Sequence, residues 1–190
     1  MVDQFLRRKN QQFMKNDRSI KQSWDDRIGK LCELINKSAN YYTTSSCSGR
    51  VLILINDKEK RDDLFLFVSH NLISFKELQS IIAGIQTKTK KLVYFKHDPA
   101  ILHVACRTLE DAQNLHDLAK DNGWKRCGII STKNRYIVEL NVTERLEFPI
   151  VNNGKSLIDD YFLDLIVKEA NKKLKVSWNK IERLTKTLKN

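Results

Sequence analysis

Short apolar runs and amphipathic segments alternate along the chain in a strand–strand–helix order that occurs about three times. Neighbouring strands joined by short turns pair antiparallel, because a parallel pair needs a long crossover connection. The sequence therefore predicts an α+β fold with a mixed, largely antiparallel sheet built from strand–strand–helix units. The predicted strands are Val51–Ile55, Leu64–Val68, Leu92–Lys96, Ile101–Arg107, Ile129–Thr132 and Tyr136–Val142.

The helical segments carry recognisable boundary signals. Ser74–Ile85 opens with a capping box, in which Ser74 is the N-cap and Glu77 stands three residues later. Leu109–Asn122 is followed by Gly123, a residue type that commonly ends helices. The other predicted helices are N- and C-terminal flanking segments: Asp3–Asn16, the apolar helical pattern from Trp24 to Ile35, and Ser156–Leu188.

Composition narrows the class of protein. The 190 residues include two prolines and six glycines and hold no low-complexity linker, so one domain over residues 1–190 is expected. The net charge of +11 indicates a polyanionic partner such as nucleic acid. The longest uncharged runs have 12 residues, too few to span a membrane. Without a signal sequence or a C-x-x-C motif, the four cysteines favour a reduced, cytoplasmic location.

The last predicted helix has an apolar seam. Val167, Leu174, Ile181 and Leu188 stand seven residues apart in a stretch rich in lysine. The helix either docks on the N-terminal helix with a solvated outer face, or presents an RNA-facing ridge or a dimer seam. The oligomeric state is left open.

Polar residues occupy positions where apolar ones are expected in a strand. In Ile101–Arg107, the two-residue period puts His103, Ala105 and Arg107 on one face and three apolar residues on the other. The polar face is either exposed to water or part of a functional site.

The segment Thr43–Arg50 is a second polar cluster. If it is extended, Thr44, Ser46, Ser48 and Arg50 line one face. Hydroxyl groups beside a guanidinium suit a carboxylate or a phosphate, because arginine presents a planar fork of donors. The alternative is an ordinary polar turn that leads into a strand.

Several enzyme signatures are absent, among them glycine-rich nucleotide loops. His103 and Cys106 have the spacing of a zinc pair, but residues three apart on a strand point to opposite faces, so no metal is expected. Ser69-His70 ends the apolar run Leu64–Val68, where a histidine is either a cap or an active-site residue.

Three motifs in this order carry a resemblance: Ser45-Ser46-Cys47-Ser48-Gly49-Arg50, Ser69-His70 and Pro99-x-x-Leu102-His103-Val104-x-Cys106-Arg107. Together they resemble the tRNA wybutosine-synthesizing protein 3 family, the S-adenosylmethionine-dependent wybutosine methyltransferases, in its shorter archaeal form. The similarity runs from about Tyr41 to the C-terminus. The chain departs from the family pattern at Asp98, where glutamate is usual, at Cys127, where serine is usual, and in the charged turn Asp57–Asp63, which lacks glycines.

The resemblance implies a cytoplasmic enzyme that uses S-adenosylmethionine to methylate N4 of a tricyclic guanosine derivative. That base is 7-aminocarboxypropyl-demethylwyosine at position 37 of phenylalanine tRNA, in the anticodon stem-loop. A nucleotide in a loop is unpaired and can be splayed out and held by stacking. The basic surface of the protein then needs only to bind the RNA backbone. The alternative is a non-catalytic tRNA-binding or adaptor protein. An RNA-processing nuclease ranks last, since a carboxylate cluster for metals is lacking.

Site roles follow from the same resemblance. His103 or His70 is expected to act as general base or as a polarising hydrogen-bond partner, because imidazole titrates near neutral pH. Asp98 is expected to orient that histidine. The residues expected to bind substrate or cofactor are Ser46, Ser48, Gly49, Arg50, Ser69 and Arg107. The anion held near Arg50 is either the donor's carboxylate or the carboxylate of the nucleotide's side chain, and Arg107 would hold phosphate.

Overall fold

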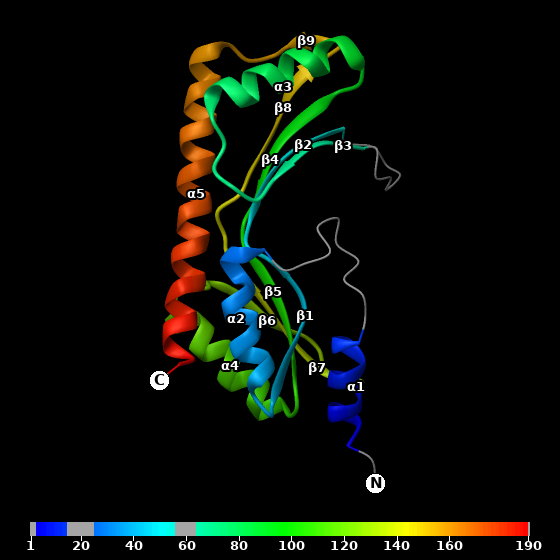
Figure 1. The fold of residues 1–190 in the computed structure, drawn as a ribbon, viewed down its shortest axis with the longest axis vertical. Helices are drawn as coiled ribbons and strands as arrows, with labels where there is room; N and C mark the ends of the chain where they lie inside the picture. The colour runs from blue at the N-terminus through cyan, green and yellow to red at the C-terminus, as the bar shows by residue number, and fades with distance from the viewer. Residues whose placement is uncertain (1–2, 15–24, 56–63, 190) are drawn as a thin grey trace. The chain divides into compact units, whose positions relative to one another are not determined.

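The computed structural model describes residues 3–14, 25–55 and 64–189, and Figure 1 shows the course of the chain. These residues fall into two compact units. Unit 1 comes from Met1–Ser48, Ala100–Thr143 and Trp178–Asn190, and unit 2 from Gly49–Pro99 and Glu144–Ser177. The single domain expected over residues 1–190 stays a prediction, and each unit is described by itself. Trp24 and the charged turn 56–63 lie outside the described residues.

Unit 1 is built on an antiparallel four-stranded sheet in the order β1-β5-β7-β6. Its strands are β1 (Tyr41–Cys47), β5 (Ile101–Cys106), β6 (Arg126–Ser131) and β7 (Tyr136–Asn141). Its helices are α1 (Gln4–Phe13), α2 (Asp26–Lys37), α4 (Leu109–Asp121) and the C-terminal part of α5 (Asp160–Thr187).

One face of this sheet forms the main core of unit 1. Leu102, Val104 and Cys106 of β5 pack there with apolar residues of α2, α4 and the end of α5, so the predicted two-residue period of this strand is confirmed. Trp124 is fully buried in the same core, and its indole nitrogen donates to the Lys180 carbonyl at 3.3 Å.

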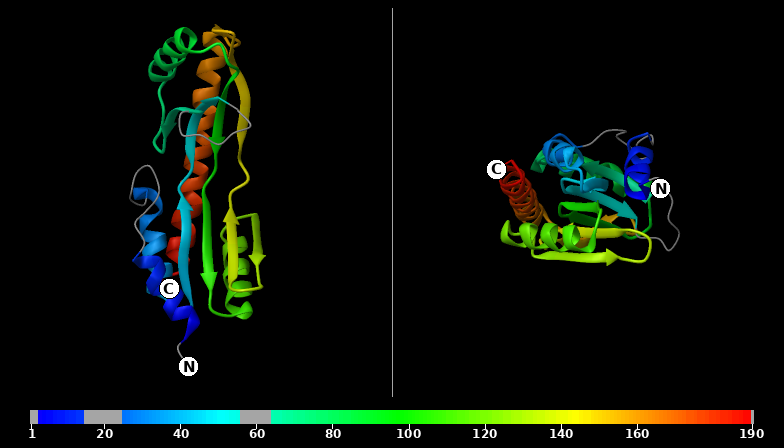
Figure 2. Two further views of the ribbon diagram at one scale, coloured as in Figure 1. Left: turned by 90° about the vertical axis from the view of Figure 1, so that its right-hand side faces the viewer. Right: turned by 90° about the horizontal axis from the view of Figure 1, so that it is seen from below.

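The opposite face of the sheet carries α1, which Figure 2 shows apart from α2 and α4. Tyr42, Ala105 and Ile137 form a small cluster on this face, and Phe5 of α1 packs against it. The Phe5 and Tyr42 rings lie 5.2 Å apart between centroids. Helix α1 covers only part of this face: His103, which lies on the same face of β5 as Ala105, stays partly exposed.

Unit 2 holds an antiparallel five-stranded sheet in the order β3-β2-β4-β8-β9. Its strands are β2 (Arg50–Ile55), β3 (Phe65–Ser69), β4 (Val93–Asp98), β8 (Leu146–Asn152) and β9 (Lys155–Ser156). Helix α3 (Phe75–Lys88) and the first part of α5 complete the unit. Asn171 of α5 exchanges two hydrogen bonds with the Ile73 backbone, at 3.0 and 2.8 Å.

The α+β fold and the largely antiparallel pairing are confirmed, and so is the capping box at Ser74. The strands occur in two sheets, however, and the antiparallel pairing expected between the neighbouring strands Leu92–Lys96 and Ile101–Arg107 is wrong. Strand β4 belongs to the sheet of unit 2 and β5 to the sheet of unit 1. Proline disfavours the helical region for the residue before it, so Asp98 stays extended and the chain does not reverse there.

The heptad positions of α5 are buried within the chain. Leu174 and Ile181 are 0% and 2% exposed, and Val167 is 6% exposed. These apolar residues are therefore covered by other parts of the same chain and are not free to form a dimer seam, whereas the alternative of an RNA-facing ridge, which concerns the basic outer face of the helix, stays a prediction. No helix among residues 3–14, 25–55 and 64–189 is both long and apolar enough to cross a membrane.

A two-residue hairpin joins β8 to β9 and provides a stability prediction. Asn153 and Gly154 both have positive φ, 51° and 72°, as a type I′ turn requires. A Cβ on Gly154 would lie 2.9 Å from the Gln86 carbonyl oxygen. We expect Gly154→Ala to destabilise the protein by about 1–2 kcal/mol, from backbone strain and this contact. Urea unfolding measures the change.

Gly84 is the matched control for this variant. It lies inside α3, and a Cβ there would meet nothing within 4 Å. Gly84→Ala is expected to stabilise the protein by about 0.5–1 kcal/mol, because alanine loses less backbone entropy in a helix. If the two variants shift stability in the same direction, the steric and conformational argument at Gly154 is wrong.

Candidate active site

A chain of hydrogen bonds crosses three neighbouring strands on the face of unit 1 that carries α1. His103 stands opposite Ser45 on β1 and opposite Glu139 on β7. The Ser45 hydroxyl lies 2.9 Å from His103 Nδ1, and a Glu139 carboxylate oxygen lies 2.8 Å from His103 Nε2. The histidine and glutamate side chains are 28% and 31% exposed, so the group is held firmly and is still open to solvent.

The carboxylate fixes the tautomer of the histidine. An ionised Glu139 offers only acceptors, so His103 Nε2 carries a hydrogen and donates it. In neutral His103, Nδ1 is then the nitrogen with a free lone pair, and the Ser45 hydroxyl donates to it. Histidine held in this way acts as a general base, because the carboxylate orients the ring and balances the charge of the imidazolium that forms. The arrangement can remove a proton from a group bound beside Ser45.

Asp98 has different partners. Arg50 Nε and one Nη each lie 3.3 Å from the same Asp98 oxygen, and Lys96 Nζ lies 3.7 Å from the other. Arg50 and Asp98 face each other on β2 and β4 of unit 2. The carboxylate that contacts His103 is that of Glu139, and the role of Asp98 in orienting a histidine stays a prediction.

The serines of the polar cluster do not share the face that an extended strand predicts. The register of β1 shifts between Thr43 and Ser45, and the strand ends at Cys47. Ser46 instead hydrogen-bonds the Cys32 side chain of α2, whose pKa burial raises to about 11. The left-handed φ of Gly49, 100°, explains the glycine before β2.

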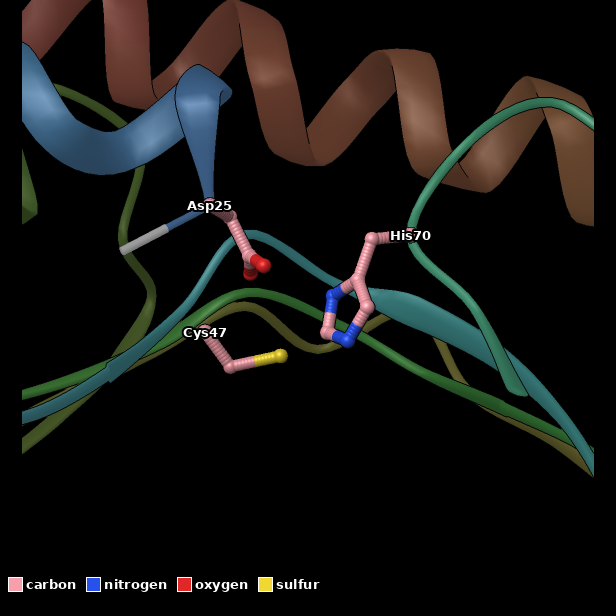
Figure 3. A group of neighbouring side chains, drawn as sticks. All are labelled: Asp25, Cys47 and His70. Carbon is pink, nitrogen blue, oxygen red and sulfur yellow. The ribbon is translucent and has the colours of Figure 1, made fainter. Parts of the chain in front are cut away.

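Ser48 hydrogen-bonds the carboxylate of Asp25. It is fully buried, and both its backbone nitrogen and its hydroxyl donate to one oxygen of Asp25, at 3.0 and 3.1 Å. Figure 3 shows Asp25 at the start of α2 and Cys47 at the end of β1. A group that already satisfies a buried carboxylate is poorly suited to bind an anion, so this geometry favours a structural role for Ser48.

Replacing Ser48 tests that role. In Ser48→Ala the buried Asp25 loses its hydroxyl donor, and we expect a loss of about 1–3 kcal/mol in the free energy of unfolding. Thermal and urea unfolding measure it, and Ser45→Ala on the exposed face of the preceding strand β1 is the control, with little expected change. If Ser48→Ala unfolds like the parent protein and instead binds substrate less tightly, Ser48 belongs to the binding site.

The remaining predicted residues lie at strand ends. Ser69 ends β3, and its hydroxyl accepts from the Asn71 backbone nitrogen at 3.2 Å in a local turn. His70 follows in unit 2 and is the third side chain labelled in Figure 3. Arg107 follows β5, forms an ion pair with Asp3 and lies 5.8 Å from the centre of the Phe5 ring.

Sequence reasoning missed Glu139, although a signal was present. Tyr136–Asn141 reads Tyr-Ile-Val-Glu-Leu-Asn, with one charged residue inside an apolar strand. A charged residue there needs a partner or access to water. Which partner it has depends on the order of the strands, and the sequence does not reveal that β7 pairs with β5.

The comparisons with known proteins concern the chain as a whole. The model of the family Methyltransferase TYW3 matches residues 3–190. The chain belongs to this family. A relative in Archaeoglobus fulgidus named "tRNA(Phe) 7-((3-amino-3-carboxypropyl)-4-demethylwyosine(37)-N(4))-methyltransferase" is 34% identical over 192 residues, which cover 99% of this chain and 93% of the relative. The resemblance inferred from the three sequence motifs is thereby confirmed.

A further relative and a solved structure are similar to this chain in sequence and in fold. The tRNA wybutosine-synthesizing protein 3 homolog of Xenopus laevis is 38% identical over 182 residues, 92% of this chain and 70% of the relative. A solved structure of the PH1069 protein from Pyrococcus horikoshii is 32% identical, with a TM-score of 0.86 over 97% of this chain and 94% of that one.

Proposed function

We propose that the protein methylates N4 of 7-(3-amino-3-carboxypropyl)-4-demethylwyosine at position 37 of phenylalanine tRNA. The name of the Archaeoglobus relative and membership of the family support this activity. The observation that carries it in this chain is the Ser45–His103–Glu139 hydrogen-bond chain, which supplies an oriented base for the proton that N4 loses.

In this proposal the donor, S-adenosylmethionine, supplies a methyl group that its sulfonium has already activated. The protein has to hold the acceptor nitrogen in line with that group, at roughly 3–3.5 Å from the methyl carbon, and to take up the N4 proton. His103 Nδ1 receives this proton, the Glu139 carboxylate balances the resulting positive charge, and Ser45 keeps the ring placed before substrate enters.

The Arg50–Asp98 pair fits the amino-acid end of a ligand. Its guanidinium matches a carboxylate, its carboxylate matches an ammonium, and the Arg50 side chain is 36% exposed. Both S-adenosylmethionine and the aminocarboxypropyl arm of the acceptor end in these two groups, so the pair suits either. We propose that Arg50 binds the carboxylate of one of them.

The function is tested by transfer of label. Purified protein is incubated with labelled S-adenosylmethionine and tRNA from a strain that lacks the gene, in which the unmethylated tricyclic base accumulates. Label is expected at position 37 of phenylalanine tRNA, and an isolated anticodon stem-loop with the same base should also accept it. If the tRNA binds and no label moves, the protein is an adaptor and not a methyltransferase.

A further inference from the structure

A pocket of about 220 Å³ opens on the same face of unit 1 as His103. Its walls are the first turns of α1, the start of β1, the end of β5, and the turn 132–135 that joins β6 to β7. The volume is several times that of a water molecule, about 30 Å³ in the liquid. The proposed methyl transfer does not use this pocket, and of the residues that line it only Arg107 is expected from the sequence to bind a ligand, a phosphate.

The lining of the pocket is strongly basic. Arg8, Arg107, Lys133 and Arg135 contribute four cations, and the residues that line the pocket include no carboxylate. Arg8 is fixed in place by a hydrogen bond to the Asn134 carbonyl, and Arg107 by its ion pair with Asp3 beside the pocket. Within residues 3–14, 25–55 and 64–189, Lys133 and Arg135 form no ion pair, and both are exposed. Their charges are therefore available to a ligand.

The charge selects the class of ligand. S-adenosylmethionine carries one carboxylate, one ammonium and one sulfonium, so its net charge is positive and four cations repel it. A phosphodiester is anionic, and arginine binds its oxygens with two parallel hydrogen bonds. The aromatic rings of Phe5, Tyr42 and Tyr136 also line the pocket, and rings beside basic groups are the usual combination for stacking unpaired bases.

The pocket lies near His103, the proposed general base, along the sheet. Ala105 stands beside Tyr42 under α1, and His103 precedes it by two residues on β5, a rise of about 7 Å. One RNA strand can therefore reach both places. We propose that this pocket binds the backbone phosphate of an unpaired nucleotide of the tRNA close to the base that is methylated. The inference rests on the proposed function and adds a binding site to it.

The test uses the double variant Lys133→Ala/Arg135→Ala, because both side chains are exposed and their loss leaves the core intact. Binding of a fluorescent anticodon stem-loop is measured by anisotropy at several salt concentrations, and binding of S-adenosylmethionine by calorimetry. We expect RNA affinity to fall about tenfold or more, and the slope of log affinity against log salt to become shallower by about one to two. Affinity for S-adenosylmethionine should stay unchanged.

Lys76→Ala is the control, since Lys76 is an exposed cation on α3 of unit 2. An RNA affinity and salt slope equal to those of the parent protein in the double variant would overturn the pocket, while label transfer by the parent protein would still support the methyltransferase. Loss of S-adenosylmethionine binding alone would assign the pocket to the donor and also overturn the inference. The proposed function itself fails only if the parent protein transfers no label.

Discussion

Replacing His103 with alanine is expected to lower the rate of methyl transfer by about 10²–10⁴-fold, the usual contribution of a positioned general base. The reason is that Nδ1 of His103 is the basic atom of the Ser45–His103–Glu139 chain, and alanine leaves no group there to accept the N4 proton. The single-turnover rate with labelled S-adenosylmethionine measures the loss. Because the side chain is 28% exposed, the unfolding midpoint should change little.

Two further variants distinguish the role of His103 as general base from the roles of Glu139 and Ser45, which position it. Glu139→Gln keeps the size of the side chain and removes its charge, so the tautomer and the balance of charge at His103 are both lost, and kcat should fall while KM for tRNA stays close to that of the parent protein. Ser45→Ala removes a hydroxyl that only places the ring, and a smaller decrease is expected. Full activity in His103→Ala would show that the proton leaves by another route.

Local patterns predicted local structure well in this chain. The alternation in Ile101–Arg107 placed His103 and Arg107 on the side opposite the core, since side-chain direction on a strand depends only on position. The capping box at Ser74 likewise depends on residues three apart. The three motifs that carried the family resemblance are also readable without a structure.

Strand pairing is the part that could not be read from the sequence. Strands β4 and β5 are separated by Pro99-Ala100 and resemble a hairpin, yet they join different sheets. Glu139 became a partner of His103 only because β7 lies beside β5. The burial of Ser48 against Asp25 depends on contacts between residues 23 apart. Such long-range contacts are set by packing of the whole unit, which a period or a spacing does not encode.

The protein is expected to lose stability in mild acid because of His97. This residue of β4 is fully buried in unit 2, and burial lowers its pKa from 6.5 to about 4, with a smaller contribution from the Lys173 charge. The backbone and carboxylate of Glu144 and the carboxylate of Asp98 oppose this shift. Below pH 6.5 the unfolded chain binds a proton at His97 that the folded protein excludes, so acid favours unfolding.

The stabilisation from neutral His97 is therefore complete above about pH 6.5 and is lost as the pH falls towards 4, where the loss reaches about 3 kcal/mol. At pH 5 we expect the free energy of unfolding to be about 2 kcal/mol lower than at pH 7.5 on account of this residue. Urea unfolding at the two pH values measures the difference.

The variant His97→Gln keeps a polar side chain that does not titrate, so most of this pH dependence should disappear even if the variant is less stable at both pH values. His116→Gln, on helix α4 of unit 1, is the matched control and should keep the dependence of the parent protein. Equal slopes of stability against pH in His97→Gln and the parent protein would mean that His97 takes up its proton over the same pH range in the folded protein as in the unfolded chain. A charge buried at the end of β4 would then need a partner, and Asp98 and Glu144 are the carboxylates placed to supply it.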